Sequence, residues 1–333
     1  MSRLRSDIPV LYLVVPCYNE EEVIEKSASV IKDKMTRLVS EGKISQESKA
    51  LFVNDGSKDN TLKMLHDLSK KDSFYGVLSF AGNYGHQSAI LAGMMEARHY
   101  ADAVVTIDAD LQQDIEALDR FLECYMNGCD VVYGVRNDRN TDGLFKKMTA
   151  VTYYKLMHLL GSEALTNSAD YRLMSAKALN ALSQYEESSL FLRGLIPTMG
   201  FESDIVYFDV KEREAGQSKY TFKKMMTLAM DGITSSSIRP LRMIAGLGAI
   251  TVIAAIVMII FSIVDWASGN AVQGYTTTLI VTLVLGGVIL VSLGVMGEYI
   301  GKTYMEAKHR PRYIIDSVVL RECRMKDENK ESR

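Results

Sequence analysis

Apolar residues are concentrated in the C-terminal third of the chain. No charged residue occurs from Met243 to Val264 or from Trp266 to Met296. Each stretch approaches or exceeds the roughly 20 apolar residues that cross a bilayer core. A buried helix of a soluble protein seldom runs this far without a charge, so the pattern predicts two membrane-spanning helices.

Charges beside these stretches predict their orientation. The connecting segment Asp265–Gly274 contains no Lys or Arg, whereas basic residues lie before the first stretch and after the second: Lys223, Lys224, Arg239, Arg242, Lys302, Lys308, Arg310 and Arg312. The positive-inside rule then places both termini in the cytosol, as expected for a two-span protein of the cytoplasmic (inner) membrane. Gly297 and Gly301 have the spacing of closely packed helices, which favours a homo-oligomer.

Before the spans, short apolar runs alternate with segments of helical length. The expected strands are Val10–Pro16, Ala50–Asp55, Gly76–Phe80, Ala103–Asp108 and Asp130–Gly134, and helices are expected from Glu20, Asp59, His86 and Ile115. Strands separated by helices form a parallel sheet, and nearly continuous apolar runs indicate that helices cover both of its faces. The sequence therefore predicts an α/β domain with a mostly parallel sheet.

The overall composition hides this division. Of the 333 residues, 47% are hydrophobic and 24% charged, with a formal net charge of -3, and the mean hydropathy is +0.01. This balance excludes a strongly basic nucleic-acid-binding protein and a disordered acidic chain. The four cysteines have neither CxxC nor zinc-like spacing, so we expect reduced thiols.

Polar residues cluster where the predicted strands end. The segments concerned are Pro16–Glu20, Asn54–Thr61 and Asp108–Asp110. Ligands of open α/β sheets bind outside the carboxyl ends of the strands, so we expect a ligand site there. A dinucleotide fold is disfavoured because no GxGxxG follows the first strand. Gly301-Lys302-Thr303 mimics the end of a P-loop but lacks its first glycine and a preceding strand.

Asp108 and Asp110 are spaced to share one hard cation. Mg²⁺ or Mn²⁺ is commonly held by one or two carboxylates together with substrate phosphates. The pair therefore predicts a divalent metal site and a nucleotide-diphosphate donor, because the cation would neutralise charge on a departing diphosphate.

Several motifs together resemble those of a known family. They are VVPCYNEEEVI, FVNDGSKDNT, GNYGHQSAILAGM, TIDADLQ, SADYRLMS, FLRGLIPTMGF and EREAGQSKY, followed by the two apolar stretches. From about Val10 to Pro311 the chain resembles the polyisoprenyl-phosphate glycosyltransferases of glycosyltransferase family 2, which have a GT-A fold and include enzymes like bactoprenol glucosyltransferase and dolichol-phosphate mannose synthase.

The resemblance implies roles for individual residues. Pro16, Tyr18, Glu20, Asp55 and Asp108 would bind the donor nucleotide, Asp108 and Asp110 the metal, and Arg193, Arg213, Ser218 and Lys219 the phosphates of donor and acceptor. Asp170 matches the family's catalytic base and lies beside Arg172, and together with Asp110 these are the expected catalytic residues. Since a phosphate monoester has a second pKa of about 6, we expect Asp170 to orient the acceptor or Arg172 rather than to remove a proton.

The chain also departs from the family pattern. Where the family often has DADLQDPPE, this chain has DADLQQDIE, so that Gln113 and Asp114 follow Gln112. Asp114 does not align with the third acidic residue of the family motif, so no metal-binding role is expected for it. Gln112 matches the family motif better. His86 and Gln87 lie in a motif near the donor, although His86 could equally cap the following helix.

The resemblance implies an inverting enzyme acting at the membrane. It would transfer a hexose from a nucleotide-diphosphate sugar to undecaprenyl or another polyprenyl phosphate at the cytosolic membrane face. UDP-glucose is the expected donor, and UDP-N-acetylglucosamine, UDP-galactose and GDP-mannose stay open. No nucleic acid is expected to bind, and a tetramer is one candidate assembly.

Two alternatives fit the motifs less well. A processive polysaccharide synthase would normally carry QxxRW and more spans, but the single tryptophan, Trp266, lies between the spans. A membrane-anchored nucleotide-sugar sensor would need no acceptor site, so the SADYR and RGL motifs disfavour it.

The predicted organisation has four parts. A GT-A domain is expected over 1–225, a juxtamembrane interfacial segment over 226–240, two transmembrane helices over 241–300 and a cytosolic tail over 301–333. Leu144–Leu160 and Tyr220–Ile238 combine apolar and basic residues, which is typical of amphipathic helices at an anionic membrane surface.

Overall fold

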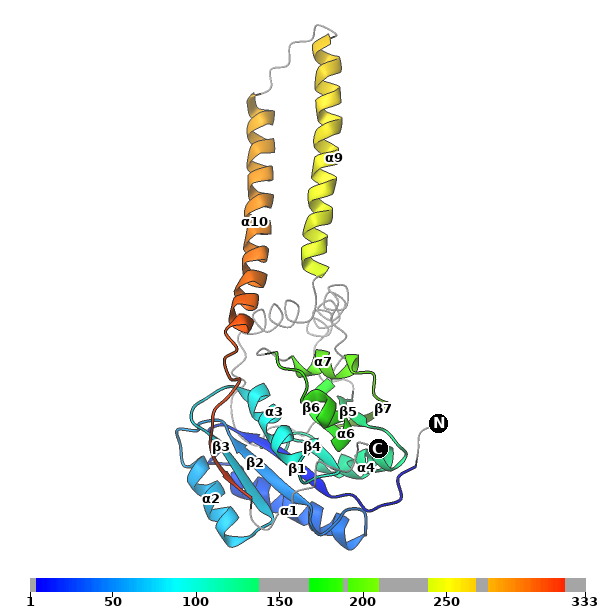
Figure 1. The fold of residues 1–333 in the computed structure, drawn as a ribbon, viewed down its shortest axis with the longest axis vertical. Helices are drawn as coiled ribbons and strands as arrows, with labels where there is room; N and C mark the ends of the chain where they lie inside the picture. The colour runs from blue at the N-terminus through cyan, green and yellow to red at the C-terminus, as the bar shows by residue number, and fades with distance from the viewer. Residues whose placement is uncertain (1–3, 138–167, 188–190, 210–238, 268–274, 321–333) are drawn as a thin grey trace. The chain divides into compact units, whose positions relative to one another are not determined.

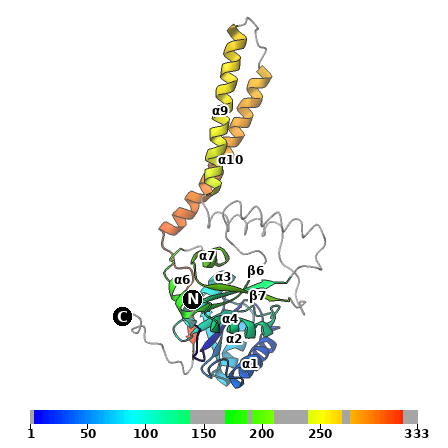
Figure 2. The same cartoon turned by 90° about the vertical axis from the view of Figure 1, so that its right-hand side faces the viewer.

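The computed structural model describes residues 4–137, 168–187, 191–209, 239–267 and 275–320. The chain divides into two compact units. The first comprises residues 1–152, 163–219 and 311–333, and the second comprises residues 153–162 and 220–310. The first unit contains the sheet and the second contains two long helices (Figures 1 and 2).

An eight-stranded sheet organises the first unit. Its strands are β1 (Leu11–Cys17), β2 (Lys49–Asn54), β3 (Tyr75–Phe80), β4 (Ala103–Thr106), β5 (Val131–Arg136), β6 (Ser168–Ser175), β7 (Ser203–Phe208) and β8 (Ile315–Val319), in the order β7-β5-β6-β4-β1-β2-β3-β8. Strands β1 to β4 are mutually parallel, and β7 runs parallel to β5. The five predicted strands and the mostly parallel sheet are confirmed.

Helices cover both faces of this sheet. They are α1 (Ile24–Ser40), α2 (Thr61–Lys71), α3 (His86–Ala97), the short 3-10 helix η1 (Ile115–Ala117), α4 (Leu118–Met126), α6 (Ala176–Leu182) and α7 (Leu192–Thr198). Side chains alternate across a strand, so Leu13 of β1 packs in one core with α1, α2 and α4, while Val14 packs in another with α3, α6 and α7. The prediction from the apolar strands, that helices cover both faces of the sheet, is confirmed.

Helix α3 lies very close to the sheet. A Cβ atom on Gly93 would come within 2.3 Å of a Val14 methyl group and 2.8 Å of a Val53 methyl group. Only glycine allows this approach. The close contact fixes the height of α3 over β1 and β2 and thereby places its first residues, His86 and Gln87, beside the carboxyl ends of the strands.

Two antiparallel strands were not predicted from the sequence. β6 is inserted between β4 and β5, and Thr106 of β4 lies opposite its Arg172. β8 follows the second long helix in sequence and pairs with the edge of β3. The Tyr313 ring stacks on Phe80 with centroids 5.0 Å apart, and Arg312 donates to the backbone carbonyls of Tyr185 and Glu187. The expected C-terminal tail therefore contributes a strand to the sheet.

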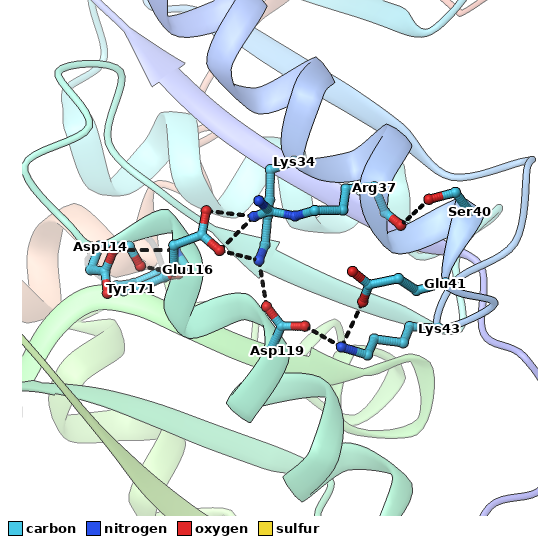
Figure 3. Close-up of polar contacts among 9 residues, drawn as sticks. All are labelled: Lys34, Arg37, Ser40, Glu41, Lys43, Asp114, Glu116, Asp119 and Tyr171. Carbon is cyan, nitrogen blue, oxygen red and sulfur yellow. Dashed lines mark hydrogen bonds and ion pairs between the residues drawn. The ribbon is translucent and has the colours of Figure 1, made fainter.

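An ionic network joins α1 to η1 and α4 (Figure 3). The buried Lys34 ammonium contacts Glu116 at 2.7 Å and also contacts Asp119. Arg37 donates to Glu116 at 2.6 Å, and Lys43 donates to Asp119 at 2.6 Å. Because η1 directly follows the loop that starts at Asp108, this network holds the far end of that loop against α1.

The second unit contains α9 (Arg239–Ala267) and α10 (Tyr275–Ala307). Met243–Val264 is entirely helical, and the second apolar stretch is helical from Tyr275. Among the described residues, one helical stretch, Val284–Ala307, is long and apolar enough to cross a membrane. Two spans therefore stay a prediction. The expected amphipathic segments, 144–160 and 220–238, lie outside the described residues.

Candidate active site

Asp55, at the end of β2, is held by the loop that follows β3. Its carboxylate accepts the backbone N–H groups of Tyr84 at 2.6 Å and Gly85 at 2.9 Å. Burial raises the pKa of Asp55, and the two hydrogen bonds oppose that shift. The next residue, Gly56, has a φ of +62°, and a Cβ there would lie 2.3 Å from the carbonyl carbon of Gly82. The sequence Asp-Gly thus lets two loops meet closely enough to fix this carboxylate.

The loops after β1 and β2 are hydrogen-bonded to each other. The Asn19 side chain accepts the N–H of Lys58 at 2.9 Å, and the N–H of Glu20 donates to Thr61 at 2.9 Å. Pro16 is buried within β1, whereas Tyr18 is exposed. The predicted grouping of Pro16–Glu20 with Asn54–Thr61 is therefore present at one edge of the sheet.

The Asp108 carboxylate follows β4 and has two different sides. Its Oδ2 accepts a hydrogen bond from the Gln113 amide. Its Oδ1 is buried and accepts no hydrogen bond from the described residues. His86 Nε2 lies 3.5 Å from Oδ1, on a side chain that is 48% exposed. Burial raises the pKa of Asp108.

Asp170 of β6 accepts hydrogen bonds from three side chains. Arg193 of α7 donates through Nε at 3.0 Å and Nη2 at 2.7 Å, Arg172 donates at 2.8 Å, and Gln87 donates at 3.0 Å. Burial alone would raise the pKa of Asp170, but the charge and hydrogen bonds of Arg193, with Arg172 and His86, hold it well below the usual range. Asp170 is therefore a carboxylate at every physiological pH.

His86 lies between the carboxylates of Asp108 and Asp170. Its Nε2 is 3.5 Å from Asp108 Oδ1 and 3.7 Å from Asp170 Oδ2. The N-cap residue of helix α3 is Gly85, and His86 is the first residue of the helix, so His86 is not its N-cap. The carboxylates of Asp108 and of the arginine-bound Asp170 therefore lie on either side of the His86 imidazole.

The predicted site residues are brought together only in part. Asp55, Asp108 and Asp170 all lie near His86, and Arg193 is paired with Asp170. Arg172 is 1% exposed, and its hydrogen bond to Asp170 links it to this cluster. Arg213, Ser218 and Lys219 lie outside the described residues.

Sequence reasoning did not identify two contacts of this cluster. Gln87 donates to the Asp170 carboxylate, and the Thr106 hydroxyl donates to the Asp170 carbonyl at 2.6 Å. Gln87 follows His86 within a motif that was already associated with the donor. Thr106 gave no signal because its partner strand, β6, was not predicted.

The acidic residues fit a cation that also binds phosphate. No group of three or more His, Cys, Asp and Glu side chains within the described ranges is arranged to hold a metal by itself. Asp108 nevertheless has a buried oxygen that accepts no hydrogen bond from any described residue, and Asp110 lies two residues away. Such a set suits Mg²⁺ or Mn²⁺ that takes its remaining ligands from phosphate and water.

Comparison with known proteins matches both units. Residues 12–183 match the family Glycosyl transferase family 2, and residues 239–303 match the GtrB C-terminal hairpin. Uncharacterized glycosyltransferase YkoT of Bacillus subtilis is 42% identical over 94% of this chain and 93% of its own length.

Relatives with a named activity are nearly as similar. The prophage bactoprenol glucosyl transferase homolog of Escherichia coli is 40% identical over 92% of this chain and 98% of its own. The bactoprenol glucosyl transferase of Shigella phage SfV is 39% identical over 91% and 97%. With a family 2 domain followed by the GtrB hairpin, the chain belongs to glycosyltransferase family 2 and is a glycosyltransferase that is similar to bactoprenol glucosyl transferases over most of its length.

Proposed function

We propose that this enzyme transfers glucose from UDP-glucose to undecaprenyl phosphate or a similar polyprenyl phosphate. The observation that carries the proposal is that His86 lies between two differently charged groups. One is the Asp108 carboxylate, and the other is the Asp170 carboxylate with its bound arginines. Asp108 Oδ1, which accepts no hydrogen bond from the residues that the structure describes, suits a cation-bound diphosphate, and Arg193 beside Asp170 suits a second phosphate. The names of the relatives, which specify bactoprenol as acceptor and glucose as donor sugar, support the same reaction.

The donor would bind across the carboxyl ends of β1, β2 and β4. Pro16, Tyr18, Glu20 and Asp55 would contact the nucleoside, and Asp108 and Asp110 would hold Mg²⁺ or Mn²⁺. Bound there, the cation neutralises the charge that develops on the leaving nucleoside diphosphate. The hydrogen bonds from the Tyr84 and Gly85 N–H groups to Asp55, and from the Ser27 hydroxyl to the Ala109 carbonyl, would hold these groups in place before the donor arrives.

The acceptor phosphate would attack the anomeric carbon directly. Its second pKa of about 6 makes it mostly dianionic at neutral pH, so no protein base is needed. Asp170, already charged and bound by two arginines, would instead position Arg193 toward the acceptor phosphate. Arg213, Ser218 and Lys219 would add further phosphate contacts. A single displacement of this kind inverts the anomeric configuration.

The helices of the second unit would anchor the enzyme in the cytoplasmic membrane. We propose that α9 and α10 both span it, with the catalytic unit and both termini on the cytosolic side. The basic residues at 239, 242, 302 and 308 and the absence of Lys and Arg from 265–274 support this orientation. The acceptor could then keep its polyprenyl tail in the bilayer while its phosphate enters the site. Gly297 and Gly301 make a homo-oligomer the expected assembly.

A donor panel tests the proposed reaction. The purified full-length protein is incubated in detergent with undecaprenyl phosphate, Mn²⁺ and one radiolabelled donor: UDP-glucose, UDP-N-acetylglucosamine, UDP-galactose or GDP-mannose. We expect organic-extractable label mainly from UDP-glucose. Greater transfer from another donor would replace glucose in the proposal, and no lipid-linked product from any donor would contradict the reaction.

A further inference from the structure

Gln113 is a buried amide in the loop that joins β4 to η1. Its side chain is 2% exposed. The Oε1 atom accepts the backbone N–H of Asp108 at 3.0 Å, and the Nε2 group donates to Asp108 Oδ2. One side chain thus binds both the backbone and the carboxylate of the same residue, which restricts rotation of that carboxylate.

An amide is the group that this geometry requires. The Asp108 N–H needs an acceptor and the Asp108 carboxylate needs a donor, and Gln supplies both without adding charge. A carboxylate at position 113 could accept the N–H but would place a second acceptor against Oδ2. As a consequence of the amide, Oδ2 is hydrogen-bonded, whereas Oδ1 is buried, accepts no hydrogen bond within the described part of the chain and lies 3.5 Å from His86 Nε2.

The backbone of this loop has supports other than Gln113. The carbonyl of Ala109 accepts the Ser27 hydroxyl at 2.6 Å, and the carbonyl of Asp114 accepts the Tyr171 hydroxyl at 3.1 Å. The N–H of Leu111, at a φ of +47°, donates to the carbonyl of Asp108 at 3.1 Å. Loss of the Gln113 side chain should therefore affect the direction of the Asp108 carboxylate more than the path of the loop.

We propose that Gln113 is a positioning residue for the divalent cation of the glycosyl transfer. By retaining Oδ2 of Asp108, it directs Oδ1 toward the position of the cation. The inference rests on the proposed function in one respect, because it takes Asp108 as a ligand of the metal. Groups that orient metal ligands commonly change metal affinity by about 10- to 100-fold when they are lost.

Mn²⁺ binding to full-length Gln113→Met measures this role. Methionine keeps nearly the same volume but makes neither hydrogen bond. We expect the dissociation constant for Mn²⁺ in the presence of UDP, followed by the EPR signal of free Mn²⁺, to rise about tenfold or more. Gln46→Met is the matched control, because Gln46 is exposed in the turn before β2, at the opposite edge of the sheet. It should bind Mn²⁺ like the parent.

Gln113→Asn tests the same role if the methionine variant does not fold. It keeps a polar amide in the buried position, but the shorter side chain cannot maintain both bonds to Asp108, so Mn²⁺ binding should weaken here as well. At saturating Mn²⁺ the turnover of both variants should recover toward that of the parent, since mass action overcomes a loss of affinity. Parent-like Mn²⁺ affinity in the folded variants would overturn the inference.

A double-mutant cycle separates this inference from the proposed function. If Gln113 acts through Asp108, Gln113→Met should weaken Mn²⁺ binding little further in an Asp108→Asn background. Additive losses would mean that Gln113 acts by another route and would contradict the inference alone. Parent-like Mn²⁺ affinity of an Asp108→Asn variant would show that Asp108 is not a metal ligand, and would overturn both this inference and the metal site of the proposed function. Lipid-linked product is assayed separately, so failure of the reaction itself is recognised independently.

Discussion

The Asp170 carboxylate accepts hydrogen bonds from Arg172, Arg193 and Gln87, and these contacts fix its charge. A general base must be able to gain a proton near the working pH, and its pKa is usually tuned toward that pH. The pKa of Asp170 lies well below its usual range instead, because the two guanidinium groups outweigh burial. The residue is therefore better suited to hold arginines in place than to exchange a proton.

Replacing Asp170 with Asn tests this role. The neutral amide no longer anchors Arg193, so we expect kcat to fall on the order of 100-fold through loss of an oriented charge. Because the parent residue stays ionised, the factor should be constant between about pH 6 and pH 9. The measurement is kcat against pH for parent and variant. A loss confined to acid pH and rescued at alkaline pH would indicate a base and contradict the orienting role.

Asp130→Asn is the matched control for that experiment. Asp130 is also 5% exposed and is also paired with cationic groups, Arg5 and Lys177. It precedes β5, at the opposite edge of the sheet from the site. The substitution should lower thermal stability while leaving kcat within about twofold of the parent, as expected for a structural ion pair.

Gly56 tests the close contact that fixes Asp55. An alanine Cβ at position 56 would overlap the backbone of Gly82 and Asn83, at 2.3 and 2.7 Å, in addition to the cost of a positive φ. Gly42→Ala is the control, because Gly42 also has a positive φ, +68°, but no atom lies within 4 Å of the added Cβ. We expect Gly56→Ala to lower the melting temperature by about 6–12 °C and Gly42→Ala by about 2–4 °C. Equal decreases in melting temperature for the two variants would mean that the positive φ alone, and not the close contact with Gly82, requires glycine at position 56.

Much of the site could be predicted at the residue scale. Asp55 and Asp108 were identified because they end the predicted apolar strands, and the structure places them just beyond the ends of β2 and β4, at one edge of the sheet. The roles of Gln113 and Gln87 could not be predicted, because each depends on a side chain that reaches a residue on another turn of the chain or on another strand. The spacing of residues along the sequence does not show in which direction these two side chains point.

At the scale of elements, the first five strands were predictable because each is a continuous apolar run between helical segments. β6 and β8 were not, since each pairs antiparallel with a strand distant in sequence. β8 is also short and follows a charged segment after α10. Long-range pairing of this kind leaves no local periodicity, although β6 carries Asp170 and Arg172 into the site.

The network between α1 and α4 gives a prediction for stability. Glu116→Gln with Asp119→Asn removes both partners of Lys34, whose side chain is 2% exposed, and leaves a buried ammonium without a carboxylate. We expect a loss of about 2–3 kcal/mol, seen as a fall of about 4–12 °C in melting temperature. Lys34→Met should cost less than half as much, because Arg37 and Lys43 still pair with the two acidic residues. A larger loss in Lys34→Met would contradict this account.

The same network predicts how stability depends on pH. The Arg37 and Lys34 hydrogen bonds lower the pKa of Glu116, and those of Lys34 and Lys43 outweigh burial and lower that of Asp119. The unfolded chain therefore binds protons more readily than the folded chain, so stability falls as pH drops through the ordinary carboxylate range of about 4. The melting temperature of the parent should decrease from pH 6 to pH 3, and the double variant should show a shallower decrease.

At the scale of the whole molecule, the sequence divides into a catalytic unit and a pair of long apolar helices. This division was visible in the distribution of charge, because the helices contain long stretches without a charged residue. The return of residues 315–319 to the catalytic sheet was not visible in the sequence, and these residues belong to the unit that precedes the helices. The family 2 and hairpin matches follow the same division.

The most direct test of the proposed reaction compares the parent with Asp110→Ala in one assay. Both full-length proteins are given UDP-[¹⁴C]glucose, undecaprenyl phosphate and saturating Mn²⁺, and the initial rate of organic-extractable label is measured after folding is checked by thermal unfolding. We predict acceptor-dependent product from the parent and a rate at least about 100-fold lower from Asp110→Ala, because the leaving diphosphate loses part of its charge stabilisation. Near-normal turnover by the folded variant would contradict the assignment of this site.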